Sequence, residues 1–129
     1  MRVLLDTHAF LWWTSEGGRN LSDRARDLLS DSSTDAVVSV ASAWEIAIKV
    51  ASGRLEIEGD PEQWVPERIH RYGFSAMPVE LAHALRAGRL PAIHGDPFDR
   101  LLVAQARVEG IPIVTSDPAI SRYDVEVIW

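Results

Sequence analysis

Residues 96–106 read DPFDRLLVAQA, and the rest of the chain is most simply interpreted around this stretch. Asp96 followed by Pro97 is the pattern of a helix N-cap and first helical residue, so a helix is predicted to begin here and to end at Gly110. A mostly apolar stripe recurs at helical spacing: Phe98, Leu101, Leu102, Gln105 and Val108. Asp99 falls in the first turn, where the positive end of the helix stabilises an anion. Such a carboxylate suits a metal ion, and it also suits an ordinary helix terminus.

Short apolar stretches alternate with helical patterns along the chain. Strands are predicted at residues 3–5, 36–40, within 74–79, 111–115 and, as an edge strand, 125–129. Helices are predicted at residues 7–13, 21–30, 42–51, 61–71, 81–87 and 96–109. This alternation is typical of the α/β class, with a central, mostly parallel sheet of four to five strands flanked by helices. The length fits a single domain over residues 1–129.

Particular residues set three of these helix boundaries. Ser42 and Glu45 have the S-x-x-E spacing of a capping box, which predicts a helix start at Ser42. Asn20 or Ser22 is expected to cap the second helix. Gly88 is expected to end the fifth helix, because glycine disfavours helical backbone.

Composition and charge exclude several classes of protein. The chain has 129 residues, a formal net charge of −6 and no cysteine, which excludes disulfide bonds and thiolate metal sites. No stretch approaches the roughly 18 apolar residues of a membrane span, and no signal-peptide core follows Met1, so a cytoplasmic protein is expected. The acidic charge disfavours unspecific binding to nucleic acid. Every cationic side chain except Lys49 is an arginine, a residue that binds phosphate or carboxylate through two hydrogen bonds. A local RNA-binding face and an acidic partner both remain open.

Four carboxylates are predicted to meet at one edge of the sheet. Asp6 follows the first strand, Glu45 lies in the first turn of the helix after the second, and Asp117 follows the fourth. Asp99 joins them, because its helix must run antiparallel to the strands that it connects. Clustered negative charges are unfavourable unless they protonate or bind cations, and oxygen ligands suit Mg²⁺ or Mn²⁺. The open alternative is that Asp6, Asp96 and Asp117 are simple N-caps and that Glu45 completes a capping box.

Four blocks of the sequence resemble the VapC-type PIN-domain toxins. They are LLDTHAFLWW at 4–13, SAWEIAIKVASGRL at 42–55, DPFDRLLVAQA at 96–106 and IVTSD at 113–117. The blocks lie in the order and spacing of that family and span essentially the whole chain. The resemblance implies a PIN-like three-layer fold and a Mg²⁺- or Mn²⁺-dependent endoribonuclease of a type II toxin–antitoxin system. It also implies hydrolysis of RNA phosphodiester bonds by a metal-activated water, a VapB-type antitoxin as partner, and a homodimer.

By position, the resemblance places the family's metal ligands and catalytic acids on four residues: Asp6, Glu45, Asp99 and Asp117. The resemblance also implies that Asp96 is an auxiliary acid. It implies that the hydroxyls of Thr115 and Ser116 orient the last acid, Asp117, or its water.

Three further residues beside these motifs have open roles. His8 and His94 are expected to be surface or structural histidines, with substrate contact as the alternative. Arg100 is expected to contact phosphate or to form a salt bridge.

Two other kinds of protein are alternatives to the nuclease. A phosphate-accepting receiver domain would carry an acidic pair after its first strand and a lysine after its last, whereas Asp6 stands alone and Lys49 is the only lysine. The second is a protein-interaction module of the same fold with a vestigial acidic pocket. Its binding surface would be Trp12, Trp13 and the apolar helix at 42–51.

Overall fold

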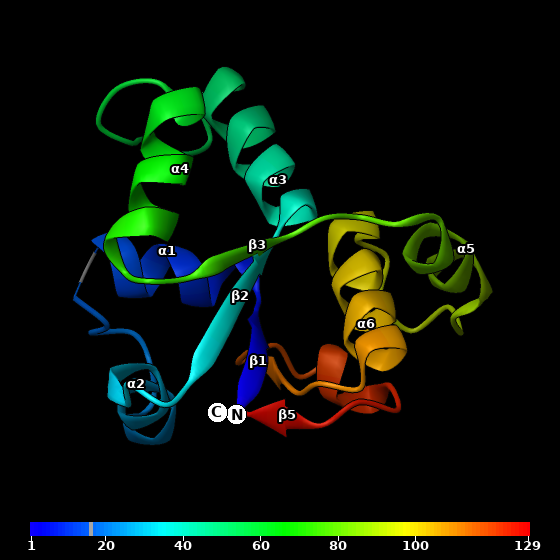
Figure 1. The fold of residues 1–129 in the computed structure, drawn as a ribbon. Coiled ribbons are helices and arrows are strands. Elements are labelled where there is room, and N and C mark those ends of the chain that lie inside the picture. The colour runs from blue at the N-terminus through cyan, green and yellow to red at the C-terminus, as the bar shows by residue number, and fades with distance from the viewer. Residues whose placement is uncertain (16) are drawn as a thin grey trace.

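Five parallel strands form the single sheet of this computed structural model, which describes residues 1–15 and 17–129 (Figure 1). The strands are β1 (Arg2–Leu5), β2 (Asp35–Ser39), β3 (Ser75–Met77), β4 (Ile113–Val114) and β5 (Val127–Ile128). Their order across the sheet is β3-β2-β1-β4-β5, and each neighbouring pair is parallel. The predicted parallel sheet with an edge strand at the C-terminal end is therefore confirmed.

Six α-helices and one short 3-10 helix surround the sheet in the described part of the chain. They are α1 (Thr7–Ser15), α2 (Asp23–Ser30), α3 (Val40–Ala51), α4 (Pro61–Arg71), α5 (Leu81–Arg89), α6 (Pro97–Glu109) and η1 (Ile120–Arg122). Helices α1 to α4 lie on one side of the sheet and α5 and α6 on the other (Figure 1). None of the described helices is long and apolar enough to cross a bilayer.

Alternating strand residues build a separate core on each face of the sheet. Val3 and Leu5 of β1 pack in the cluster formed with α1 to α4. Leu4, between them, packs in the cluster formed with α6 and η1. Both clusters consist of buried side chains, as expected for a parallel sheet that is covered on both faces. This three-layer arrangement is the predicted fold class.

The start of α3 differs from the predicted capping box. The helix begins at Val40, where residue 40 was expected to end a strand, because Ser39 caps it by accepting a hydrogen bond from the Ala41 N–H at 3.0 Å. The hydroxyl of Ser42 and the carboxylate of Glu45 instead contact Thr7, a residue of α1. Contacts with Thr7 thus replace the hydrogen bonds of the capping box that the spacing of Ser42 and Glu45 predicts.

Other helix ends follow the expected chemistry, with one exception. Asp96 caps α6 by accepting from the Phe98 N–H at 2.8 Å, and Gly110 closes that helix with a positive φ of 65°. Ser22 caps α2 through a hydrogen bond from the Ala25 N–H. Helix α5 continues through Gly88, contrary to the prediction, because its packing against α6 offsets the intrinsic cost of one glycine.

Candidate functional site

Asp6 lies at the carboxyl edge of the sheet, immediately after β1. Leu5 of β1 is paired with Val114 of β4, so the next residues, Asp6 and Thr115, face each other. The Thr115 hydroxyl donates to Asp6 Oδ2 at 2.5 Å, and the Ala9 N–H donates to Asp6 Oδ1 at 2.7 Å. Burial raises the pKa of the Asp6 carboxyl, against the lowering effect of these two hydrogen bonds. The carboxyl is therefore fixed in one orientation in a poorly hydrated position.

Glu45 is held by both of its carboxylate oxygens. The Thr7 hydroxyl donates to Oε1 at 2.7 Å, and Lys49 Nζ, one turn along α3, lies 2.7 Å from Oε2. The Glu45 side chain is 7% exposed, so the ammonium of Lys49 and the hydroxyl of Thr7 supply the partners that burial of a carboxylate requires. Glu45 is thus a preoriented acid whose charge is already compensated.

His94 joins Asp99 to Asp117. Its Nε2 lies 2.8 Å from Asp117 Oδ2 and 3.1 Å from Asp99 Oδ2. The Asp96 N–H donates to Nδ1 at 3.1 Å, so in the neutral ring the proton resides on Nε2, facing the two carboxylates. Imidazole and carboxylate atoms of His94, Asp99 and Asp117 all lie within 4.8 Å of one another, close enough to ligate one ion.

The carboxylates at this edge influence one another electrostatically. Burial, followed by the charge of Asp96, raises the pKa of Asp99 to about 7, while His94 acts in the opposite direction. The charges of Glu45 and Asp6 raise the Asp99 pKa further. Four acids are therefore close enough to share one electrostatic environment, in which a cation would be stabilised. They are Asp6 after β1, Glu45 in α3, and Asp96 and Asp99 at the start of α6.

The structure brings the four acids of the sequence prediction, Asp6, Glu45, Asp99 and Asp117, to the same edge of the sheet. The alternative interpretation as N-caps also describes part of the geometry. Asp6, Asp96 and Asp117 each accept a backbone N–H through Oδ1. Capping uses one oxygen of Asp117 and leaves Oδ2 directed at His94, so an acid can cap a turn and still face the cluster.

The two hydroxyl residues of the prediction differ in their contacts. Thr115 donates to Asp6 and accepts from the Asp117 N–H at 3.0 Å, so it contacts two of the acids. Ser116 is exposed.

The position of His94 depends on Arg100, a residue whose role differs from both expectations for it. The Arg100 guanidinium donates to the carbonyl oxygens of Ala87 and Leu90 at 2.9 and 3.1 Å, and to that of Pro91 at 3.0 Å. These bonds fix the loop that leads to His94, so Arg100 is structural. No local pattern in the sequence marked His94 as a member of the cluster.

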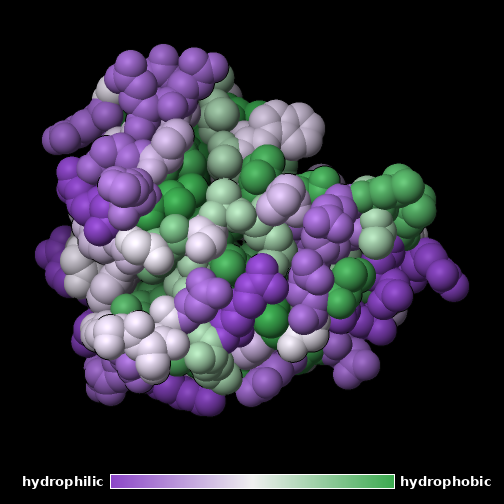
Figure 2. All heavy atoms as spheres, viewed as in Figure 1, coloured by the Kyte–Doolittle hydropathy of each residue, from purple (hydrophilic) through white to green (hydrophobic). Residues whose placement is uncertain are grey.

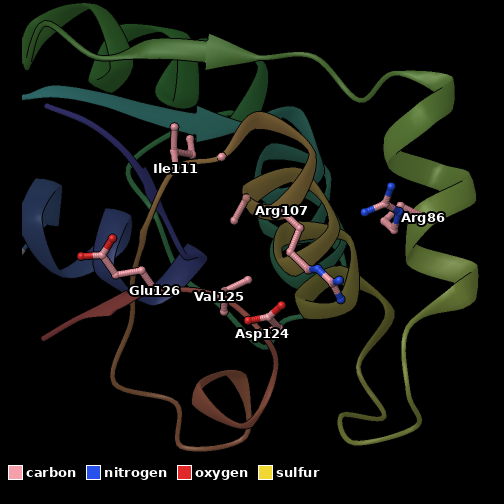
Figure 3. A pocket seen from close by; sticks show the side chains of 8 residues that line it. Arg86, Arg107, Ile111, Asp124, Val125 and Glu126 are labelled. Atoms are coloured by element: carbon pink, nitrogen blue, oxygen red, sulfur yellow. The ribbon is translucent and has the colours of Figure 1, made fainter.

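Hollows at the two ends of α6 differ in their surroundings. One, of about 220 Å³, lies next to the acids and is lined by Glu45, Ile48, Lys49, Arg54, Asp96, Pro97 and Phe98. The other, of about 340 Å³, lies at the C-terminal end of α6, where Figure 3 shows Arg107, Asp124 and Glu126 around it and Arg86 on α5. These four charged residues of the second hollow form no ion pair with one another among the described residues.

A family model described as the PIN domain matches residues 3–126. The chain belongs to the PIN-domain family. Ribonuclease VapC22 of Mycobacterium tuberculosis is 30% identical over 118 residues, which are 89% of this chain and 86% of that protein. Ribonuclease VapC16 of the same organism is 36% identical over 61 residues, 47% of this chain and 43% of that protein. The resemblance of this PIN domain to VapC proteins is thereby confirmed.

Solved structures support the same fold. The Rickettsia felis VapBC2 complex, bound to a DNA fragment from its promoter, matches with a TM-score of 0.69 and 13% identity over 99% of this chain and 98% of that one. A toxin–antitoxin complex from Klebsiella pneumoniae matches with a TM-score of 0.67 and 16% identity over 98% and 96%. At such low identity these matches show the PIN fold alone.

Proposed function

We propose that this PIN-domain protein is the endoribonuclease toxin of a type II toxin–antitoxin pair and that it cuts RNA with a divalent cation at the carboxyl edge of its sheet. The observation that carries the proposal is the cluster of His94, Asp99 and Asp117 beside buried Asp6 and Glu45. The likeness to ribonuclease VapC22 supports the reaction class.

The donor set fits a hard divalent cation. Carboxylate oxygens predominate, thiolates are absent from the sequence, and the single imidazole is compatible with Mn²⁺ as well as Mg²⁺. Asp99 and Asp117 would bind the ion with Asp6. His94 would join them through Nε2 as the tautomer that carries its proton on Nδ1, and the hydrogen bond from the Asp96 N–H to Nδ1 would then be given up. A bound cation would promote deprotonation of water and stabilise charge on the phosphate.

Glu45 has a different role in this proposal from that of the other three acids. Thr7 and Lys49 already occupy its two oxygens, so it is poorly placed to ligate an ion directly. Its fixed carboxylate would orient the water that attacks the phosphodiester bond. Thr115 would hold Asp6 in position, since it donates to Asp6 Oδ2.

A VapB-type antitoxin is the proposed protein partner, supported by the toxin–antitoxin complexes among the structural matches. We also propose that the protein is cytoplasmic and that it forms a homodimer. Support for a dimer comes from α5, where Leu81 and Leu85 are 76% and 62% exposed, one turn apart. Figure 2 shows hydrophobic surface over this part of the molecule. Apolar side chains in such a patch are stabilised by contact with another protein surface.

Thermal unfolding with and without Mn²⁺ tests the metal centre. At about 100 times its dissociation constant, a ligand stabilises the native state by ~2.7 kcal/mol, which raises Tm by roughly 10 °C for a domain of this length. The Asp99→Asn variant should lose this rise. Asp124→Asn removes an exposed acid at the other end of α6 and should keep it. An unchanged Tm for the unmodified protein would favour the protein-interaction module with a vestigial pocket.

A further inference from the structure

The hollow beside the acids is lined by both charged and apolar side chains. It lies between α3 and the first turn of α6 and has a volume of about 220 Å³. Ile48, Pro97 and Phe98 contribute its apolar surface, while Lys49 and Arg54 contribute positive charge. Because Glu45 and Asp96 also line it, the hollow is continuous with the acid-bearing edge of the sheet. A ligand that entered it would therefore lie next to the proposed metal centre.

Arg54 is directed to this hollow by the end of α3. Gly53 adopts a positive φ of 76°, which glycine tolerates, and the chain turns so that the Arg54 N–H donates to the Lys49 carbonyl at 2.8 Å. The Arg54 Nε donates to Ser52 Oγ at 2.9 Å, which restrains the guanidinium. Its two terminal nitrogens have no protein partner in the described part of the chain. They are available to bind an anion through two hydrogen bonds.

Phe98 supplies an aromatic ring to the lining of the hollow. Its ring meets that of Trp44 edge to face, with centroids 5.4 Å apart and an angle of 75° between the planes. Trp44 is 64% exposed, so the pair lies at the surface beside the acids. Unstacked bases of single-stranded nucleic acid bind to such aromatic rings, whereas bases inside a duplex are already stacked.

We propose that the hollow between α3 and α6 binds one nucleotide of single-stranded RNA adjacent to the cleaved bond, with its phosphate on Arg54 and its base on Phe98. The inference rests on the proposed ribonuclease function and identifies where that site recognises its substrate. Lys49 is committed to Glu45, so Arg54 is the cation left to bind the phosphate. The aromatic ring of Phe98 and the two available guanidinium nitrogens of Arg54 match the base and the phosphate of a nucleotide.

RNA binding by variants of the 129-residue chain tests this pocket. All variants carry Asp99→Asn to prevent cleavage, and the probe is a short, fluorescently labelled single-stranded RNA of mixed sequence followed by anisotropy. Arg54→Ala should weaken binding about tenfold or more, as expected for loss of a charged hydrogen bond, and should lower the slope of log affinity against log salt by about 0.7. Arg54→Lys should be intermediate, because lysine lacks the two-pronged geometry. Arg86→Ala removes another exposed arginine, beside the hollow at the far end of α6, and is the matched control; it should change affinity less than about twofold.

A second pair of variants tests the base contact. Phe98→Leu keeps an apolar side chain but removes the aromatic face, and should weaken RNA binding by about tenfold, whereas Phe98→Tyr should retain it. A duplex of the same sequence should compete poorly. Thermal unfolding of each variant checks that it is folded. If Phe98→Leu does not fold, the Arg54 variants alone decide whether the hollow binds a nucleotide.

The possible outcomes distinguish failure of the nucleotide pocket from failure of the proposed ribonuclease function. If Arg54→Ala binds RNA as tightly as Arg86→Ala, the nucleotide pocket is wrong, while RNA cleavage by the unmodified protein would leave the ribonuclease function standing. Effective competition by the duplex would overturn the base contact. If the unmodified protein neither binds nor cuts RNA, the proposed function and this inference both fail.

Discussion

The two ends of α6 present charged residues to opposite edges of the sheet, and the charges behave differently. At the N-terminal end, Asp99 lies among other acids and its pKa is raised to about 7. At the C-terminal end, Arg86 and Asp124 are exposed beside a larger hollow. Charges near water are screened and interact weakly, whereas charges with restricted access to water interact strongly. A candidate site is therefore better recognised by electrostatic coupling between its groups than by the size of a hollow.

The largest expected effect is on cleavage by Asp99→Asn. Removing one carboxylate from the coupled cluster should lower kcat/KM for RNA on the order of 100- to 1000-fold, as loss of a preorganised charge does in other enzymes. Asp124→Asn, at the opposite end of α6, should change it less than about twofold. Comparable losses in both variants would abolish the distinction between the two ends.

The variant His94→Ala tests whether the imidazole contributes to the acid cluster. We expect a 10- to 100-fold loss of kcat/KM, of the size seen when a group that supports a metal site is removed. A titration with Mn²⁺ should show weaker binding, because Asp99 and Asp117 lose the imidazole that lies between them. Unchanged Mn²⁺ affinity would make His94 a positioning residue for the two carboxylates and not a ligand.

Two substitutions compare the shielded ion pair of Lys49 and Glu45 with the exposed pair of Arg71 and Glu67. The first is Lys49→Met. It leaves Glu45 with a buried, uncompensated carboxylate and should lower the free energy of unfolding by about 1–2 kcal/mol, a value reduced because Lys49 is 28% exposed. Arg71→Met breaks an exposed pair with Glu67 at the same i, i+4 spacing and should cost less than about 0.5 kcal/mol.

Urea unfolding measures both costs. Adding Glu45→Gln to Lys49→Met should recover part of the loss, because the amide needs no counter-charge. A cost for Arg71→Met equal to that of Lys49→Met would show that burial does not distinguish the pairs.

The smallest effect is the pH dependence of the metal-free protein. The pKa of Asp99 is raised to about 7 and that of Asp6 is also raised, so the folded state binds these protons more tightly than the unfolded chain, whose aspartates titrate near 3.9. Their contribution to stability is therefore present at low pH and is lost as the pH rises through about 7.

Melting curves in a chelator check the sign of this effect. Tm should be lower at about pH 8 than at about pH 6, and Asp99→Asn should flatten the difference. A rise in Tm toward pH 8 that depends on Asp99 would contradict the raised pKa.

Much of the fold follows from local chemistry in the sequence. Asp96 and Pro97 start α6 as predicted, because capping and a fixed φ act on neighbouring residues. The meeting of Asp6 with Asp117 follows from the parallel sheet, which places the ends of β1 and β4 side by side. Such inferences need only the order of the elements.

Residues positioned by distant contacts were harder to predict. The capping box at Ser42 was wrong because Thr7, 35 positions earlier, contacts its hydroxyl. His94 was missed because its backbone N–H donates to the Tyr123 hydroxyl, 29 positions away, and its loop depends on Arg100. No periodicity or spacing encodes these contacts.

Because α6 carries Asp99 and, through Arg100, also anchors the loop of His94, one helix positions two of the three residues that lie within reach of one ion. Asp6 belongs to the sheet, against which Leu102 and Val103 of α6 are packed. Enlarging or shrinking either apolar side chain would shift the helix and change the distance of Asp99 and His94 from Asp6 without altering any charge. The affinity of the proposed metal centre would therefore depend on uncharged interior positions that contact no ligand.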